Sequence, residues 1–270
     1  MDSIAKTSLL TAAMRAAESN RSEREGRLFV DPFAELLAGT EGASLLKRAL
    51  EESGEQPAIA LRTKFIDEKI LGALKDGIRQ IVMLAAGMDT RAYRFSFPTG
   101  TKIFELDRRE VLEYKQMKLA GNRPNCEQIF LGVDLREAWQ NELLAKGFRP
   151  GERTLWLVEG LVMYLEESQV LELFGRINSL AVPKDILLCD ILSRTILEAP
   201  YMVKQLQFLE SIGAPWKFGV NEPEDFMRKV GWNAVATQPG EYAPTRWPFP
   251  IAPRHVPNVP RSFYVEAEKI

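Results

Sequence analysis

The chain has 270 residues, of which 46% are hydrophobic, which is enough for a full globular core. Its 35 basic and 37 acidic residues leave a formal net charge of −2. The sequence therefore lacks the excess of basic residues that is typical of proteins that bind nucleic acid or an anionic membrane surface. The two cysteines, Cys126 and Cys189, lack metal-ligand spacing and indicate ordinary thiols of a reducing compartment. Without a signal peptide or an apolar run of about 18 residues, we expect a cytoplasmic protein with no bound metal.

Residues 1–75 carry helical patterns and no strand pattern. The expected helices cover residues 8–19, 33–37 and 65–74. The pair Asp31-Pro32 is typical of a helix start. We interpret this segment as a helical cap packed over the carboxyl ends of a sheet, which is where open α/β folds bind their ligands.

From residue 78 onward, strand patterns alternate with amphipathic segments. The expected strands are 79–85, 102–107, 127–133, 153–159, 184–192, 233–237 and 262–268. This alternation predicts an α/β core over residues 76–270, with a doubly wound, mostly parallel, seven-stranded sheet and helices on both faces. The late pair of strands predicts an antiparallel final strand beside the last parallel ones.

Residues 239–260 form a proline-rich insertion before the last strand. The proline spacing predicts extended backbone and excludes a helix. The insertion either shapes a substrate pocket or serves as a surface connection, and the sequence favours neither.

The most informative pattern starts at the apolar run 81–84, which stops at the small residues 85–87. It is typical of a buried parallel strand that enters a tight turn. A second apolar strand, 102–107, ends in an acidic residue, and an acid at such a tip accepts hydrogen bonds from ribose hydroxyls. Because the turn has one glycine rather than G-x-G-x-x-G, we infer a ligand with a ribose but no diphosphate, and S-adenosylmethionine fits this description.

Two carboxylates follow the second and third strands. Asp107 is expected to bind ribose, with the N-cap of a following helix as the alternative. Glu105 shares its face of the strand, one step back from the tip, and is the second candidate. Asp134 and the backbone of Leu135 are expected at adenine, while capping of a helix over residues 136–144 is the alternative for Asp134.

Four further residues are candidates for the reacting end of the site. Glu159 ends the fourth strand and could meet the ammonium of a bound methionine group or form a salt bridge to an arginine. Arg62, in the helical cap, could clamp the methionine carboxylate or be solvated. Tyr164 could direct its hydroxyl toward the transfer site or simply pack, and His255 is expected at the surface.

The segment LAAGMDTRAYR at residues 84–94 resembles the signature L-G-A-G-x-D-T-R-x-Y-R of the leucine carboxyl methyltransferase-like family. The resemblance extends over nearly the whole chain. Residues 104–108, 133–136 and 156–165 resemble the family's next three motifs, and 28–34 and 261–263 resemble its terminal patches.

The resemblance implies a class I methyltransferase fold with S-adenosyl-L-methionine as cofactor. It implies Arg62 at the methionine carboxylate, Gly87 in the methionine turn and Glu159 beside the amino-acid part. It also implies Asp107 at ribose, and Asp134 with Leu135 at adenine. The chain departs from the family at Ala85, where the family has the first glycine of the turn. The methyl group of Ala85 leaves less room for a ligand to approach the backbone there.

These observations predict transfer of a methyl group to a small-molecule carboxylate or hydroxyl. Methyl transfer requires mainly positioning, and an ionised carboxylate requires no base. The candidates for a base are Tyr164 and His255, and this scarcity favours a carboxylate or an acidic hydroxyl as acceptor. The alternatives are a protein or peptide carboxyl methyltransferase, a nicotinamide-dependent oxidoreductase and a binding protein that has kept the fold.

Overall fold

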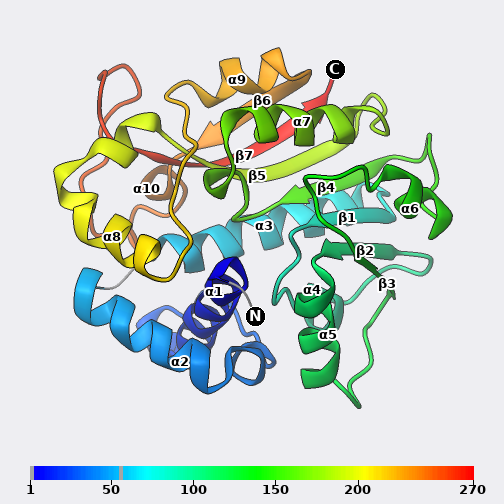
Figure 1. Cartoon of the computed structure of the whole chain (residues 1–270), viewed down its shortest axis with the longest axis horizontal. Coiled ribbons are helices and arrows are strands. Elements are labelled where there is room, and N and C mark those ends of the chain that lie inside the picture. Colours follow the sequence, from blue (N-terminus) through cyan, green and yellow to red (C-terminus); the bar gives the residue numbers. More distant parts are fainter. Residues whose placement is uncertain (1–2, 55–56) are drawn as a thin grey trace.

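The computed structural model describes residues 3–54 and 57–270. Its strands form one sheet in the order β3-β2-β1-β4-β5-β7-β6 (Figure 1). The strands are β1 (Gln80–Leu84), β2 (Lys102–Asp107), β3 (Glu127–Gly132), β4 (Thr154–Val158), β5 (Ile186–Leu192), β6 (Trp232–Thr237) and β7 (Ser262–Lys269). Strands β1 to β5 pair in parallel, whereas β7 lies antiparallel between β5 and β6. The predicted seven-stranded, mostly parallel sheet with an antiparallel last strand is therefore confirmed.

Helices alternate with the strands after a helical N-terminal segment. The helices are α1 (Ser3–Ser19), α2 (Ala34–Ser53), α3 (Pro57–Lys75), α4 (Arg91–Arg94), α5 (Arg109–Lys118), α6 (Gln140–Ala145), α7 (Glu167–Asn178), α8 (Val203–Ser211), α9 (Pro223–Lys229) and α10 (Pro239–Tyr242). Short 3₁₀ turns are η1 (Glu23–Glu25), η2 (Val162–Tyr164), η3 (Arg194–Glu198) and η4 (Pro200–Met202).

The sheet is the middle layer of a three-layer core because successive side chains of a strand point to opposite faces. Val82 of β1 is buried in one hydrophobic cluster with residues of α6, α7 and α9, including Phe174. Its neighbour Ile81 is buried in a second cluster on the other face, with residues of α3 such as Ile66 and Ile70. Burial on both faces explains why the central strands have no polar alternation.

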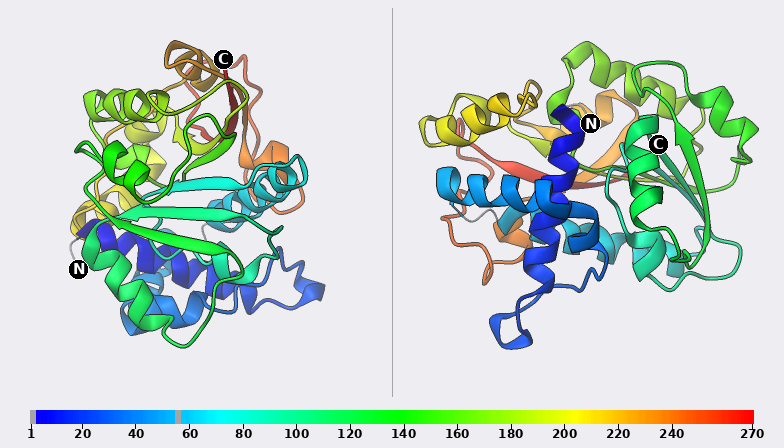
Figure 2. Two further views of the ribbon diagram at one scale, coloured as in Figure 1. Left: turned by 90° about the vertical axis from the view of Figure 1, so that its right-hand side faces the viewer. Right: turned by 60° about the horizontal axis from the view of Figure 1, so that its bottom comes forward.

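Helices α1 and α2 pack against each other, and the blue N-terminal helices lie together in both views of Figure 2. Leu9 and Ala12 of α1 are buried with Leu37 of α2, and the same cluster includes Val111 of α5. Helix α3 falls within the segment predicted as a cap, yet it covers one face of the sheet. The division of the chain at residue 75 stays a prediction.

The proline-rich stretch contains a short helix, so the prediction that residues 239–260 exclude helix is wrong for α10. Pro239 occupies the first helical turn, where an N–H would have no intrahelical partner and the fixed φ of proline suits the helix. The side chains of Gln238 and Glu241 complete a capping box at this end. Proline therefore starts this helix rather than preventing it.

Candidate functional site

A cavity of about 470 Å³ lies at the carboxyl ends of the parallel strands. This is the edge at which open α/β sheets bind ligands. Eight of the residues predicted for the site line this one cavity: Arg62, Ala85, Gly87, Asp107, Asp134, Leu135, Glu159 and Tyr164. The fold thus collects residues that span a hundred positions of the sequence, while the role of each remains a prediction.

The turn after β1 is held in a backbone conformation that favours glycine. Gly87 has φ 48°, and a Cβ on it would come within 3.0 Å of the Cβ of Ser8 in α1. Ala85 has φ 58°, which is in the left-handed region although alanine carries a Cβ. The departure from the family signature therefore places about 1 kcal/mol of backbone strain at the turn.

Asp107 at the end of β2 binds the turn rather than capping a helix. Its carboxylate accepts hydrogen bonds from the backbone N–H groups of Gly87 and Arg108, both at 2.7 Å. Helix α5 begins at Arg109 with Arg108 as its N-cap, so the capping alternative for Asp107 is wrong. Burial raises the pKa of Asp107, against the opposing effect of the two N–H donors. A carboxylate has about four acceptor positions, so two remain for ribose hydroxyls, and the residue fits a nucleoside.

Asp134 lies at the rim of the cavity beside the end of β3. Its carboxylate accepts hydrogen bonds from the guanidinium of Arg136 at 2.5 to 3.1 Å, and these bonds lower its pKa. Helix α6 begins only at Gln140, so Asp134 is not its cap and this alternative is also wrong. Leu135 lines the cavity next to it, as expected for a residue that would contact adenine.

Glu159 at the end of β4 forms the salt bridge that was the alternative to a ligand contact. Its oxygens accept from Arg62 Nε and Arg91 Nη1, each at 2.9 Å. Burial would raise the pKa of Glu159, but the charges of Arg91 and Arg62 outweigh it and lower the pKa. Arg62 also donates from Nη1 to Asp190 at 2.7 Å, and its pKa is raised by Asp190 and Glu159 in spite of burial. Within residues 3–54 and 57–270, these bonds occupy Nε and Nη1 of Arg62 and leave Nη2 available.

Arg91 is a functional candidate that sequence reasoning missed. It is only 2% exposed, donates from Nε to Asp67 at 2.7 Å, and also contacts Asp89 and Glu159. Burial would raise the pKa of Asp89, but the charges of Arg91, Lys115 and Arg94 and the backbone N–H of Arg91 together outweigh it and lower the pKa to about 2. The D-T-R motif contains this arginine and its partner Asp89, but Asp67 and Glu159 are 24 and 68 residues away and could not be found from local pattern. Asp190, a polar residue inside the apolar strand β5, was missed although it had that signal.

The cavity offers no free base among its described lining residues. Its carboxylates accept hydrogen bonds from an arginine or from backbone N–H groups: Asp89, Asp107, Asp134, Glu159 and Asp190. Burial raises the pKa of Tyr164, although Trp216, Arg62 and Thr7 oppose it, so the phenol stays protonated at neutral pH. His255 is exposed and does not line the cavity, as expected. The described lining of the cavity therefore supplies no general base.

The other end of the cavity is mainly apolar. Its lining comes from α1, η2, α8, the end of β5 and the segment after α8, and includes Leu10, Met14, Met163, Leu192, Leu209 and Trp216. Such a wall excludes water and fits the apolar body of a small molecule.

The proline-rich segment 239–260 contributes nothing to the described cavity lining. Arg246 instead contacts Glu18 of α1 at 3.1 Å and the carbonyl oxygen of Gly26 at 2.5 Å. Of the two interpretations of this segment, the structure supports the surface connection.

Glu105, the second candidate for ribose, lies outside the cavity lining. It is fully buried beside Lys115, whose Nζ donates to it at 2.5 Å, and Gln128 donates at 2.7 Å. In the ranges 3–54 and 57–270, no group of acidic, histidine and cysteine side chains is arranged to hold a metal ion. Within the same part of the chain, no helix is both long and apolar enough to cross a membrane.

Comparisons with known proteins agree with this geometry. The profile of the family described as "Leucine carboxyl methyltransferase" matches residues 8–178. A protein of Mycobacterium ulcerans described as "Putative S-adenosyl-L-methionine-dependent methyltransferase" is 32% identical, over 99% of this chain and 95% of its own length. A protein of Parafrankia with the same description is 38% identical over 67% of this chain, and that match spans 60% of the relative.

Solved structures show the same fold at low sequence identity. A DUF574 family protein from Streptomyces avermitilis has a TM-score of 0.63 at 13% identity and covers 96% of this chain and 97% of its own. A crystal structure described as a "putative methyltransferase", from Thermobifida fusca, has a TM-score of 0.61 at 18% identity, over 87% and 91% of the two chains. The chain therefore belongs to the leucine carboxyl methyltransferase family of S-adenosyl-L-methionine-dependent methyltransferases.

Proposed function

We propose that the protein methylates an oxygen of a small molecule, either a carboxylate or an acidic hydroxyl. The proposal includes the small molecule as its partner, a cytoplasmic location and a helical cap over residues 1–75 that packs over the carboxyl ends of the sheet. The observation that carries it is the state of the cavity's carboxylates, which are all bonded to arginines or backbone N–H groups. A cavity whose described lining offers no free base suits an acceptor that is already an anion.

The chemistry divides between cofactor and protein. S-adenosylmethionine supplies an electrophilic methyl group on a sulfonium; the S–C bond breaks as the O–C bond forms, and S-adenosylhomocysteine is the other product. In this proposal Asp107 binds the ribose, and Asp134 with Leu135 binds adenine. Arg62 binds the methionine carboxylate through Nη2, and Glu159 lies beside the ammonium. An ionised carboxylate loses no proton in the step, whereas a hydroxyl acceptor would release one to solvent.

The chain's further contribution is to hold the acceptor near the methyl group and to exclude water. Positioning of this kind supplies roughly 7–11 kcal/mol in favourable cases. The apolar wall from Met14, Met163 and Leu209 supports a small acceptor with an apolar body.

The test uses S-adenosylmethionine that carries a tritium-labelled methyl group. The purified protein is incubated with this cofactor and one class of acceptor at a time. The acceptors are arylalkyl carboxylic acids, their matching alcohols, a set of phenols and a set of peptides. Products are then treated with mild base, because a methyl ester releases labelled methanol and a methyl ether does not. Base-labile label from the acids, or stable label from the phenols, supports the proposal and identifies the oxygen. Label only in added peptides would support the protein-carboxyl alternative, and no transfer to any acceptor would support a binding protein.

A further inference from the structure

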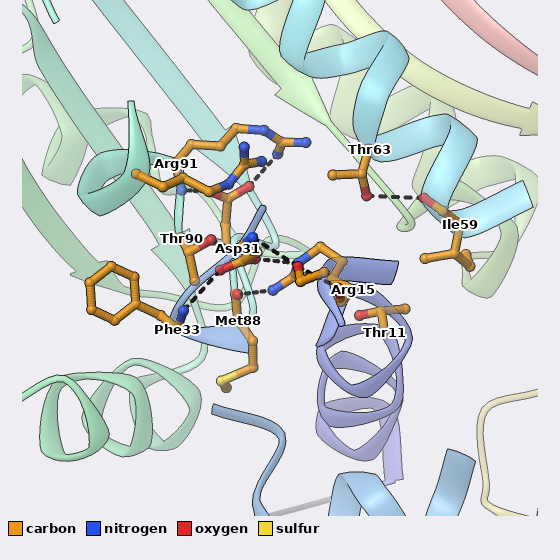
Figure 3. Close-up of polar contacts among 12 residues, drawn as sticks. Thr11, Arg15, Asp31, Phe33, Ile59, Thr63, Met88, Thr90 and Arg91 are labelled. Carbon is orange, nitrogen blue, oxygen red and sulfur yellow. Dashed lines mark hydrogen bonds and ion pairs between the residues drawn. The ribbon is translucent and has the colours of Figure 1, made fainter. Parts of the chain in front are cut away.

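Two sequence features to which the proposed function assigns no ligand contact meet in the structure. One is the segment around Asp31-Pro32 between α1 and α2, and the other is Thr90 in the D-T-R motif after β1. The hydroxyl of Thr90 donates to the carboxylate of Asp31 at 2.7 Å (Figure 3). Both side chains are almost fully buried, with Asp31 at 3% and Thr90 at 1% exposure. A buried contact between a cap residue and the cofactor turn is a feature that the cofactor site itself does not require.

Asp31 connects three parts of the chain. Besides Thr90, its carboxylate accepts from Arg15 Nε of α1 at 2.9 Å and from the backbone N–H of Phe33 at 3.2 Å. Its own backbone N–H donates to the hydroxyl of Ser19, the last residue of α1, at 2.8 Å. The bonds of Asp31 therefore fix the exit of α1, the start of α2 and the turn after β1 relative to one another.

Arg15 makes a second connection between α1 and the turn. Its Nη2 donates to the backbone oxygen of Met88 at 2.5 Å, as Figure 3 shows. Met88 follows Gly87, whose N–H is bound to Asp107 from the sheet side. The turn is thus held from the sheet by Asp107 and from the cap by Arg15 and Asp31.

Helix α1 also lines the cavity, in the apolar part that the proposed function assigns to the acceptor. Leu10, Thr11 and Met14 line the cavity and lie within two turns of Arg15, and Thr7 lies just beyond them. A change in the turn that moved Met88 or Thr90 would therefore be transmitted through Arg15 and Asp31 to the wall that faces the acceptor.

We propose that Asp31 and Arg15 are positioning residues that couple occupation of the cofactor turn to the packing of α1, so that the acceptor wall is completed only after the cofactor has bound. This inference rests on the proposed function, because it requires the turn to be the cofactor's binding site. It predicts ordered binding, with cofactor first and acceptor second. The coupling is a free energy between two sites, and such energies correspond to affinity changes of about 5- to 150-fold.

The test is hydrogen exchange of the backbone N–H groups of α1, measured with and without saturating S-adenosylhomocysteine. Calorimetric titration on the same preparations gives the Kd for S-adenosylhomocysteine. In the wild-type protein we expect S-adenosylhomocysteine to slow exchange over residues 8–15 by at least about fivefold, at the low end of measured couplings.

Two variants break the connection at different points. Asp31→Asn removes the charge that binds Arg15, and Thr90→Val removes the hydroxyl while keeping the shape of the side chain. Each should still bind S-adenosylhomocysteine, but the slowing of exchange in α1 should be lost. Thr90→Val keeps the Asp31–Arg15 ion pair, so it remains informative if Asp31→Asn does not fold.

The matched control is Arg246→Gln, which removes a contact of α1 at Glu18 without touching the turn. Its α1 should respond to S-adenosylhomocysteine as the wild type does. The inference is overturned if S-adenosylhomocysteine binds to the wild type without slowing hydrogen exchange in α1. It is also overturned if exchange in α1 of Thr90→Val is slowed as much as in the wild type. Failure of the wild type to bind S-adenosylhomocysteine at all would instead refute the proposed function, and the titration separates these two outcomes.

Discussion

The two halves of the cavity hold their carboxylates in different ways. At the end of β2, Asp107 is bonded by backbone N–H groups, and part of its acceptor capacity is left for a ligand. At the ends of β4 and β5, Glu159 and Asp190 are bonded by the guanidinium of Arg62 from α3. We expect the first half to contribute mainly to ligand affinity and the second, as a buried ion network, to contribute also to the stability of the fold. Substitutions should therefore separate affinity from stability.

The largest expected effect is on stability, at Arg91. Arg91→Met would leave Asp89, Glu159 and Asp67 without one cationic partner in a buried network. Breaking a buried pair by removing one partner costs about 3–5 kcal/mol, and we expect a loss of this size in the free energy of unfolding by urea. The control is Arg228→Met, which removes an exposed ion pair with Asp225 on α9. This change should alter the free energy of unfolding by less than about 0.5 kcal/mol. Equal effects of the two variants would show that the network does not stabilise the fold.

The second effect is on affinity, at Asp107. Asp107→Asn keeps the shape but removes the charge that ribose hydroxyls would bind, and each charge-assisted hydrogen bond contributes about 1.5–3 kcal/mol. We expect Kd for S-adenosylhomocysteine to rise about 100-fold. Asparagine keeps one acceptor oxygen for the two N–H groups of Gly87 and Arg108, so we expect a loss of about 1–3 kcal/mol in the free energy of unfolding, smaller than that of Arg91→Met. A large loss of stability with unchanged affinity would contradict the contrast between the halves.

The pH dependence of binding should come from the same residue. The folded pKa of Asp107 is raised above 3.8, so on acidification its carboxylate protonates at a pH where an ordinary aspartate is still ionised. Protonation removes the acceptor for ribose, so affinity for S-adenosylhomocysteine should fall as pH is lowered from 7 into that range. Glu159, whose pKa is lowered, stays charged there and should not contribute. Titrations across this range should show the fall in the wild type, and Asp107→Asn should show a flat profile.

The smallest effect concerns the turn. Ala85→Gly removes left-handed strain of about 1 kcal/mol, offset in part by the greater freedom of glycine in the unfolded chain. We expect a gain of up to about 0.5 kcal/mol in unfolding free energy and an affinity for S-adenosylhomocysteine that is equal or better. Ala86→Gly is the matched control, since Ala86 lacks a positive φ and the change should destabilise by about 0.5–1 kcal/mol. A loss of stability in both would show that Ala85 is not strained.

The features that sequence predicts well are those determined by local pattern. The apolar runs locate the strands, and the tip of a parallel strand locates Asp107, because these depend on side-chain period and on chain direction alone. The partners of Glu159 do not follow from local pattern, since Arg62 is 97 and Arg91 is 68 residues away from it. Asp31 was expected to start a helix, and only the tertiary structure places it beside Thr90.

The measurement that tests the central claim most directly is calorimetric titration of the purified wild-type protein with S-adenosylhomocysteine, with NADH as the control ligand. The arrangement of a single-glycine turn, Asp107 and the rim at Asp134 and Leu135 predicts one site with a Kd in the micromolar range and no heat from NADH. Absence of binding by S-adenosylhomocysteine, or binding of NADH in its place, would contradict the assignment of this cavity to S-adenosylmethionine.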